Sequence, residues 1–298
     1  MGNEMKINTF ILGSPKCGTT ALYELLNSHE DVFFPSSMKE PHFFADDLEK
    51  YKAHNTYEDF IAIYDAYNSE KIIGDASIFN MYSESAIDNI KKYNPNAKII
   101  IMMRNPVEAV PSFHSQVVFT QDENISDVSE AWDMSEFRRV GKYVPKQCRC
   151  GKILDYKKMY SYATQLEKVY SNFSKAQVLV ILHDEFKTDY KKTMKLLFDF
   201  LDIEHCDIEN KNINPNTVNK INFISKFLRH PPSFVRKIKR IILGRGRTKL
   251  YDALILANTK VVKRDNISVH LKNEIKNNYS NEIDRLAFLL GRDIHEWK

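Results

Sequence analysis

Residues 13–20 read GSPKCGTT and combine two glycines, a lysine and two threonines at one junction. An apolar run precedes this segment, and a helical pattern begins at Thr19. A strand that turns tightly into a helix points several backbone N–H groups at one place, where the helix dipole and the threonine hydroxyls favour a phosphate. We therefore predict an anion-binding loop, with an ordinary strand-to-helix turn as the alternative.

The position of the lysine separates this loop from that of the nucleotide triphosphatases. Their G-x-x-x-x-G-K-[ST] motif has a lysine directly after the second glycine. Here Gly13 and Gly18 have the required spacing, but Thr19 follows Gly18 and the lysine is Lys16, inside the loop. A cation at that point can contact the bridging oxygen between a bound phosphate and the group being transferred. This favours group transfer without a metal.

A second candidate phosphate ligand follows another apolar run. Residues 98–103 end directly in Arg104, where a magnesium-dependent phosphotransferase would carry an aspartate. Pro106 then opens a helical pattern with Ser112 two turns in. An arginine fork and a hydroxyl can bind one terminal phosphate together. The alternative is that Arg104 is only a structural end to the strand.

The elements that must position these residues are visible in the hydrophobic pattern. Short apolar runs typical of buried parallel strands lie at 7–12, 98–103 and 177–182, with 71–73 as a fourth candidate. Apolar residues recur at helical spacing in 19–28, 106–119, 154–171, 190–201 and 269–290, and Gly291 is a plausible helix stop. This alternation predicts an α/β fold in three layers, with a mainly parallel central sheet and helices on both faces.

The chain of 298 residues, 43% of them hydrophobic, has ample material for a buried core. We predict a single domain over 1–298 and exclude the disordered and collagen-like classes. Residues 121–150 are polar and interrupt the helical pattern. A long loop is expected there, either a functional lid or a tolerated insertion. Residues from about 219 to 298 are predicted to be mostly helical and basic.

The charge balance and the cysteines restrict the class of partner and compartment. A net charge of +4, from 43 Lys and Arg against 39 Asp and Glu, is too small for a general nucleic-acid binder. The four cysteines form neither a disulfide framework nor a complete zinc site. No apolar stretch approaches the roughly 18 residues of a membrane span, and no signal peptide is evident. We expect a cytoplasmic protein without a bound metal.

Four segments together resemble the sulfotransferases that use 3′-phosphoadenosine 5′-phosphosulfate (PAPS), in particular the branch with the heparan-sulfate sulfotransferases and bacterial relatives. They are SPKCGTTALYELLNSHEDV at 14–32, KEPHFF at 39–44, RNPVEAVPSF at 104–113 and LAFLLGRDIHEW at 286–297. The sequence departs from the family at Ala109, where relatives often have an arginine. It departs again at Ala76, where glycan-modifying relatives often have a lysine that contacts the substrate.

The resemblance implies a set of donor-binding residues. The loop would hold the 5′-phosphosulfate, Arg104 and Ser112 would bind the 3′-phosphate, and two cations before the last helix would lie in a basic loop over that phosphate. An aromatic residue early in the helix after residues 121–150 would lie near the nucleotide. The full set is Lys16, Cys17, Gly18, Thr19, Thr20, Arg104, Ser112, Tyr156, Lys263 and Arg264.

The resemblance also implies catalytic roles for Lys16, Glu40 and His42. Lys16 would neutralise the leaving oxygen, and Glu40 would be the general base, its pKa raised towards the working pH by a cleft that Phe43 and Phe44 line. His42 is the rival base, and its side chain is expected to point to the opposite face from Glu40. Lys39 is expected to be exposed, with a contribution to sulfate binding as the alternative.

We therefore expect transfer of a sulfuryl group from PAPS to a hydroxyl of a saccharide or glycolipid, without a metal and without a nucleic-acid partner. A sterol or a small alcohol or phenol is the alternative acceptor. A nucleotide-dependent phosphotransferase is the alternative enzyme. Residues 229–249 mix cations with apolar side chains, so a nonenzymatic nucleotide-binding protein at a membrane surface is a further reading. The oligomeric state stays open.

Overall fold

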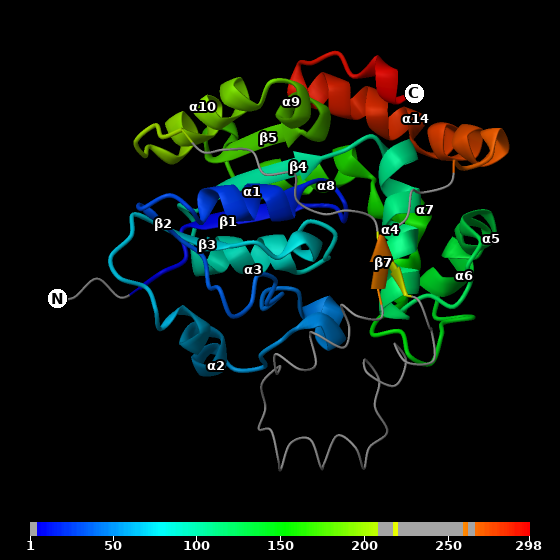
Figure 1. The fold of residues 1–298 in the computed structure, drawn as a ribbon, viewed down its shortest axis with the longest axis horizontal. Coiled ribbons are helices and arrows are strands. Elements are labelled where there is room, and N and C mark those ends of the chain that lie inside the picture. The colour runs from blue at the N-terminus through cyan, green and yellow to red at the C-terminus, as the bar shows by residue number, and fades with distance from the viewer. Residues whose placement is uncertain (1–4, 208–216, 220–258, 262–265) are drawn as a thin grey trace, which may run out of the picture.

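The computed structural model describes residues 5–207, 217–219, 259–261 and 266–298 (Figure 1). Residues 229–249, Lys263 and Arg264 lie outside the described residues. The central sheet has five parallel strands in the order β2-β3-β1-β4-β5. Their bounds are β1 Thr9–Gly13, β2 Val32–Phe33, β3 Ile72–Asp75, β4 Lys98–Met103 and β5 Val178–Leu182.

Helices cover both faces of this sheet, as the sequence predicts. The chain moves in one direction across the sheet after β1 and in the other after β3 and β4. Right-handed crossovers of opposite direction place their helices on opposite faces. Accordingly α3 contacts α8 on one face, and the His29 ring beyond α1 packs against Phe198 of α10 at 5.5 Å. The α/β fold in three layers is confirmed.

The helices of the described residues include short 3-10 helices, labelled η. The bounds are α1 Thr19–Leu26, η1 Asp46–Tyr51, α2 Tyr57–Ile61, η2 Ala62–Tyr64, η3 Ile78–Asn80, α3 Ala86–Tyr93, α4 Pro106–Thr120, α5 Val128–Asp133, α6 Ser135–Arg139, η4 Gly151–Leu154, α7 Tyr156–Met159, α8 Tyr162–Asn172, η5 Lys175–Gln177, α9 His183–Thr188, α10 Tyr190–Leu201, α14 Val269–Leu290 and η6 His295–Trp297. The predicted helices 190–201 and 269–290 have the observed bounds. Gly291 ends α14 in a left-handed conformation.

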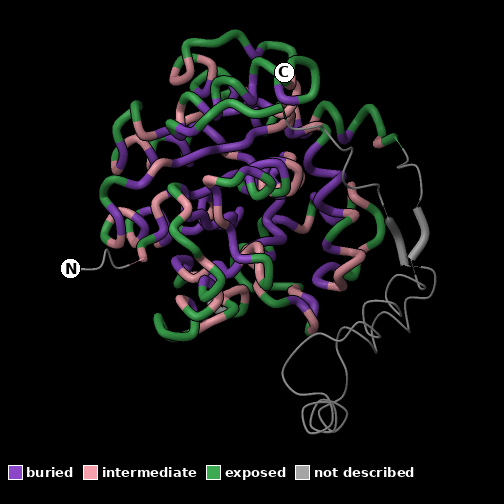
Figure 2. Tube along the Cα trace, turned by 60° about the vertical axis from the view of Figure 1, so that its left-hand side comes forward, coloured by how far each residue is buried: buried purple, intermediate pink, exposed green. Residues whose placement is uncertain are grey.

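The core lies where the apolar runs predict it. All five residues of β1 are buried, as are Ile99–Met103 of β4, and the strands form the buried centre of the tube in Figure 2. A parallel sheet covered on both faces needs apolar side chains on both faces, which is why these strands read as continuous apolar runs. The two-residue strand β2 is too short to give such a signal.

The predicted single helix over 154–171 is wrong. The chain forms η4, α7 and α8, with breaks at Asp155 and at Tyr160-Ser161. Tyr156, Tyr160 and Tyr162 are all buried within this stretch, and each hydroxyl bonds a different part of the core. A straight helix cannot direct these three side chains to their partners, so tertiary contacts override the helical spacing.

The expectation of a long loop at 121–150 is also wrong, because the segment contains α5 and α6 around a buried ion pair. Arg138 donates to Glu123 through both terminal nitrogens, one bond measuring 2.8 Å, and both side chains are buried. Arg149 donates to Asp122 at 2.6 Å and lies over the Tyr51 ring of η1 at 4.1 Å. Polar residues that pair internally make a compact unit that hydrophobic periodicity does not reveal.

The basic C-terminal part is helical in α14, which packs on α8 and α4. It also contains a strand that the sequence did not predict. The strand β7 Thr259–Val261 pairs antiparallel with β6 Thr217–Asn219. Within the described residues, no helix has the length and apolar character that crossing a membrane requires.

Candidate functional site

The loops after β1 and β4 meet at the carboxyl edge of the sheet, between two strands whose following connections run in opposite directions. In open α/β folds this switch point is where ligands bind. Gly13 ends β1 with φ 150°, and a Cβ there would lie 2.5 Å from the Met102 carbonyl oxygen of β4. Only glycine allows this close approach of the two strands. Gly18, at φ 94°, then caps α1 and orients its N-terminus.

Two buried tyrosines hold the phosphate loop of residues 13–20 in place. Tyr160 donates its hydroxyl to the Pro15 carbonyl at 3.1 Å. The Tyr162 hydroxyl lies 3.3 Å from Cys17 Sγ and donates to the Arg104 carbonyl at 2.9 Å. These contacts join the loop, the end of β4 and the start of α8. Helical spacing does not reveal these contacts, because they join residues that are remote in the chain.

Cys17 is a structural residue of this loop. Its side chain is fully buried, and burial raises the pKa of the thiol to about 11. The thiol therefore stays protonated and is a poor nucleophile. The predicted contribution of Cys17 to donor binding, through its backbone amide, is compatible with this packing.

Lys39 lies at the phosphate loop instead of being exposed. Only 18% of its side chain is accessible, and its ammonium group donates to Thr20 Oγ1 at 3.0 Å and to Glu40 at 2.9 Å. Thr19 Oγ1 is 3.5 Å away. Lys39 thus links the anion-binding loop with the proposed base. The prediction that Lys39 is exposed is wrong, because its ammonium group lies against the first residues of α1.

Glu40 and His42 lie on the same side of their segment. Nε2 of His42 is 3.5 Å from Oε2 of Glu40. The expectation of opposite faces is wrong, because side chains two positions apart in an extended segment lie on one face; in addition, His42 has a left-handed backbone at φ 50°. The imidazole faces Glu40, and the ring is buried between Phe79 at 5.3 Å and Tyr51 at 6.0 Å.

The predicted rise in the pKa of Glu40 is wrong. Burial would raise this pKa, but the hydrogen bond to His42 and the positive charge of Lys39 outweigh it and lower the pKa to about 2. Phe43 and Phe44 do not line a cleft around the carboxylate. Phe43 stacks on Phe60 at 4.2 Å, and Phe44 is buried. Glu40 is therefore an ionised carboxylate that interacts with both His42 and Lys39.

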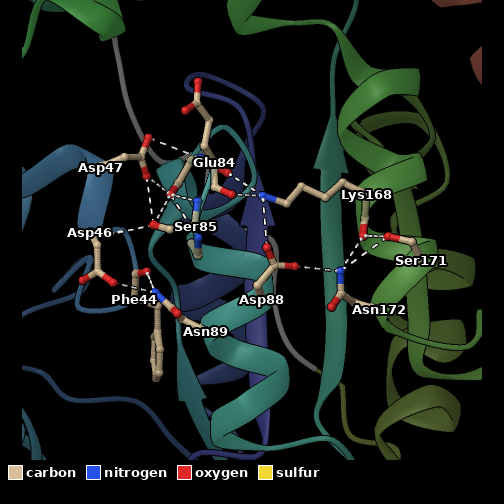
Figure 3. A network of polar contacts seen from close by, with 12 residues as sticks. Phe44, Asp46, Asp47, Glu84, Ser85, Asp88, Asn89, Lys168, Ser171 and Asn172 are labelled. Carbon is tan, nitrogen blue, oxygen red and sulfur yellow. Dashed lines mark hydrogen bonds and ion pairs between the residues drawn. The ribbon is translucent and has the colours of Figure 1, made fainter.

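The far end of the segment is tied to the start of α3, as Figure 3 shows. Asn89 donates to the Phe44 carbonyl at 2.9 Å and to Asp46 at 2.8 Å. Asp47 accepts from Ser85 at 3.0 Å and from the Glu84 amide at 3.2 Å. These bonds at the N-terminal end of α3 fix η1, and with it the position of residues 39–44 over the sheet edge.

Arg104 reaches from the end of β4 to the phosphate loop. Its Nη1 donates to the Lys16 carbonyl at 3.2 Å, and the rest of its fork pairs with Glu108, the shortest contact being 2.6 Å. Ser112 is buried on α4, three residues beyond Ala109. Lys16 itself has a left-handed backbone at φ 68° and is partly exposed. The fold therefore brings Arg104 and the phosphate loop together, as predicted.

Tyr156 packs against Phe113 of α4, the neighbour of Ser112, with ring centroids 6.0 Å apart, and its place near the nucleotide stays a prediction. It is buried, and its hydroxyl donates to Glu123 at 3.0 Å within the ion pair of residues 121–150.

His183 was not predicted as a site residue, but it lies beside the phosphate loop. A Cβ on Gly18 would lie 3.1 Å from its ring. Burial and the positive charge of Arg104 lower its pKa. Its position directly after β5, at the same sheet edge, is the signal that could have found it.

The arrangement offers cations and hydroxyls to an anion that extends from the α1 N-terminus to Arg104. A carboxylate stands beside the loop at the other end. Within the described residues, no group of three or more His, Cys, Asp or Glu side chains is arranged to hold a metal ion. Such a site can bind a molecule with two separated phosphates and polarise one of its bonds beside a base.

Comparison with known proteins gives consistent results. The sequence profile of a family described as "Sulfotransferase domain" matches residues 6–229. Carbohydrate sulfotransferase 15 of Homo sapiens is 26% identical in an alignment that covers 65% of this chain and 43% of that protein. The Rattus norvegicus protein of the same name is 27% identical with the same coverage. The match thus spans less than half the length of these curated relatives.

Two solved structures share the fold. A sulfotransferase from Alicyclobacillus acidocaldarius superposes with a TM-score of 0.71 at 21% identity and covers 99% of both chains. Mouse sulfotransferase SULT7A1, complexed with PAP, has a TM-score of 0.52 at 15% identity and covers 94% of this chain and 85% of its own. At these identities the likeness concerns the fold.

Proposed function

Because this chain belongs to the sulfotransferase family, we propose that it transfers the sulfuryl group of PAPS to an acceptor hydroxyl. The observation that carries the proposal is the contact between Arg104 Nη1 and the Lys16 carbonyl at 3.2 Å. It joins a loop suited to a 5′-phosphosulfate with an arginine suited to a second phosphate. PAPS has both groups, on one adenosine.

Donor binding would use the two ends of this site. The N-terminus of α1, Thr19 and Thr20 would receive the 5′-phosphosulfate, with Lys16 and Lys39 supplying positive charge. Arg104 would exchange its contact with exposed Glu108 for the 3′-phosphate, with Ser112 beside it. A phosphate can accept two parallel hydrogen bonds from a guanidinium group. This interaction is stronger than an ion pair with one exposed carboxylate.

In the transfer step, the acceptor oxygen forms a bond to sulfur while the bond from sulfur to the 5′-phosphate oxygen breaks. The acceptor proton passes to Glu40, whose carboxylate is oriented by His42 at 3.5 Å and by Lys39 at 2.9 Å. Negative charge grows on the departing phosphate oxygen, and Lys16 would stabilise it. The low pKa of Glu40 keeps its carboxylate ionised throughout the neutral range.

The acceptor is proposed to be a saccharide hydroxyl. Support comes from the carbohydrate sulfotransferases, which are 26% to 27% identical to this chain. Mass spectrometry after incubation with PAPS and panels of oligosaccharides, sterols and phenols would identify the acceptor class. Sulfation confined to the sterols or phenols would contradict the saccharide assignment and leave the donor assignment intact.

Calorimetry tests the donor site. We expect 3′-phosphoadenosine 5′-phosphate (PAP) to bind much more tightly than adenosine 5′-phosphate, with no loss of affinity in EDTA, because Arg104 offers the 3′-phosphate a charged fork. Arg104→Met should lower the affinity for PAP and leave that for adenosine 5′-phosphate nearly unchanged. Equal affinities of the unaltered protein for the two nucleotides would refute the proposed donor.

Substitution of the two candidate bases tests the transfer step. Glu40→Gln keeps the shape of the side chain but cannot take a proton, so turnover should fall by roughly 10²- to 10⁴-fold while PAP binding is retained. His42→Ala should lower turnover less, because His42 orients the carboxylate. An inactive His42→Ala variant together with an active Glu40→Gln variant would reassign the base to His42.

A further inference from the structure

Asp75 is a fully buried carboxyl group with no role in the site described so far. It ends β3, pairs in register with Phe10 of β1, and therefore lies at the same sheet edge as the phosphate loop. Its Oδ1 accepts from the Ser77 amide at 2.9 Å. Its Oδ2 is buried, and among the described residues it has no hydrogen-bond partner. A buried carboxyl oxygen without a partner is costly, and such groups concentrate at functional sites.

Ser77 connects Asp75 with His42. The Ser77 hydroxyl oxygen accepts the backbone N–H of His42 at 2.9 Å, and the Ser77 backbone amide donates to Asp75 Oδ1 at 2.9 Å. Both residues are fully buried. The accepted N–H belongs to the residue with the left-handed backbone, a conformation that costs a non-glycine residue about 1–2 kcal/mol. The chain from Asp75 through Ser77 thus holds the turn that directs the imidazole at Glu40.

Like Asp75, the imidazole of His42 has a buried polar atom without a hydrogen-bond partner among the described residues. Nε2 faces Glu40 at 3.5 Å, whereas Nδ1 is buried and has no hydrogen-bond partner within the part of the chain that the structure describes. When the acceptor proton passes to the Glu40–His42 pair, the pair gains one positive charge in a buried place. That charge needs a nearby negative group.

Asp75 is placed to provide the negative charge. The titratable groups that face it are His42 and Glu40 from residues 39–44 and Tyr64 from η2. Burial raises the pKa of Asp75 to about 6, the charge of His42 lowers it, and the charge of Glu40 raises it further. Asp75 therefore changes its charge near neutral pH, close to the proposed base.

We propose that Asp75 is a positioning residue for sulfuryl transfer, which holds His42 towards Glu40 through Ser77 and stabilises, as a carboxylate, the proton that the Glu40–His42 pair takes from the acceptor. No covalent bond to Asp75 forms or breaks. The proton leaves the acceptor oxygen, is shared by Glu40 and His42, and is later released to solvent. This inference rests on the proposed function, because it concerns the residue behind the proposed base.

The pH dependence of kcat in Asp75→Asn tests it. Neighbouring opposite charges shift a pKa by one to three units, so loss of the carboxylate should lower kcat about 10- to 100-fold, with the KM for PAPS and the affinity for PAP unchanged. In the unaltered protein kcat should fall below about pH 6 as Asp75 becomes protonated. The asparagine resembles the protonated form at every pH, so this acidic limb should be absent.

Asp47→Asn is the matched control, because Asp47 holds the outer end of the same segment through Ser83 and Ser85. It should lower stability and keep the acidic limb. In a His42→Ala background, Asp75→Asn should cause no further loss of kcat, since Asp75 acts through His42. Independent, multiplicative losses in the double variant would overturn the link. If Asp75→Asn does not fold, Ser77→Ala should lower kcat with the acidic limb retained, and an unchanged kcat would overturn the inference.

The outcomes separate this inference from the proposed function. Suppose that Glu40→Gln is inactive while Asp75→Asn has a normal kcat and a normal acidic limb. This result would refute the role of Asp75 and leave the proposed role of Glu40 intact. Full activity of Glu40→Gln would refute the assignment of Glu40 as the base, and the inference about Asp75 would fail with it.

Discussion

At the scale of single residues, the environment changes the chemistry that each side chain can do. Glu40 and Asp75 are both carboxyl groups near His42, yet the pKa of one is lowered to about 2 and that of the other is raised to about 6. Glu40 has a hydrogen bond to His42 and the charge of Lys39 to offset burial. Among the described residues, the Ser77 amide is the hydrogen-bond donor to Asp75, and burial dominates. Two carboxyl groups with separated pKa values are typical of acid–base sites.

Lys39 contacts both the phosphate loop and Glu40, so its removal should affect both. Lys39→Met should weaken PAP binding by about tenfold or more, since a hydrogen bond to a charged group contributes roughly 1.5–3 kcal/mol. It should also raise the pKa of Glu40, because one of the groups that lower it is lost. Calorimetry with PAP measures the first effect. Lys52→Met, which removes a lysine paired with Asp46 at 2.7 Å, should leave PAP binding unchanged.

The buried Asp75 should make stability depend on pH. Its pKa is raised from 3.8 to about 6, chiefly by burial, so the folded protein binds this proton more tightly than the unfolded chain. Its contribution is complete below about pH 4 and is lost as the pH rises through about 6, by at most roughly 3 kcal/mol. Urea unfolding across this range should show the decline in the unaltered protein. A decline of equal size in Asp75→Asn would assign it to other groups.

At the scale of elements, hydrogen bonds from neighbouring elements hold residues 39–44 in place, although these residues form no regular structure. Residues 39–44 belong to no helix or strand. Ser77 beyond β3 binds their centre, and Asn89 of α3 binds their end. The insertion at 121–150 packs against η1 through Arg149 and Tyr51. The position of the base thus depends on β3, α3 and the insertion together.

The buried pair of Arg138 and Glu123 should be essential to the insertion. Arg138→Met leaves the Glu123 carboxylate buried without its cation, at a cost of about 3–5 kcal/mol in the free energy of unfolding. Adding Glu123→Gln should restore part of that loss, because the uncompensated charge is removed. Urea unfolding measures both. Arg285→Met, which breaks the half-exposed pair with Glu167, should cost at most about 1 kcal/mol. Equal losses for the two arginines would contradict this account.

At the scale of the whole molecule, the site exists because the direction of the sheet connections reverses between β1 and β4. The carboxyl ends of β1, β3, β4 and β5 carry the phosphate loop, Asp75, Arg104 and His183, respectively. Residues about 90 positions apart, such as Lys16 and Arg104, meet there at 3.2 Å. A donor that contacts both loops would connect the two halves of the sheet. Donor binding should therefore stabilise the molecule as a whole.

The sequence alone was sufficient for the α/β class, for four of the five central strands, and for the proximity of Arg104 to the loop that contains Lys16. Each of these depends on local information. Apolar runs specify buried parallel strands, a glycine-rich turn into a helix specifies an anion site, and the ends of parallel strands share one edge. The sequence could not reveal β2, which has only two residues.

Only the tertiary structure decided the environment of Glu40, the proposed base. The imidazole of His42, a residue with a left-handed backbone, lies 3.5 Å from the Glu40 carboxylate and is buried, and its burial follows from contacts with remote residues. Lys39 reaches Thr20, which lies 19 positions away, and the balance of burial against these new charges lowers the pKa of Glu40. Such effects depend on distances between residues that are remote in the chain. Hydrophobic periodicity and motif spacing carry no information about those distances, so the residue types predicted a base but its environment came from the fold.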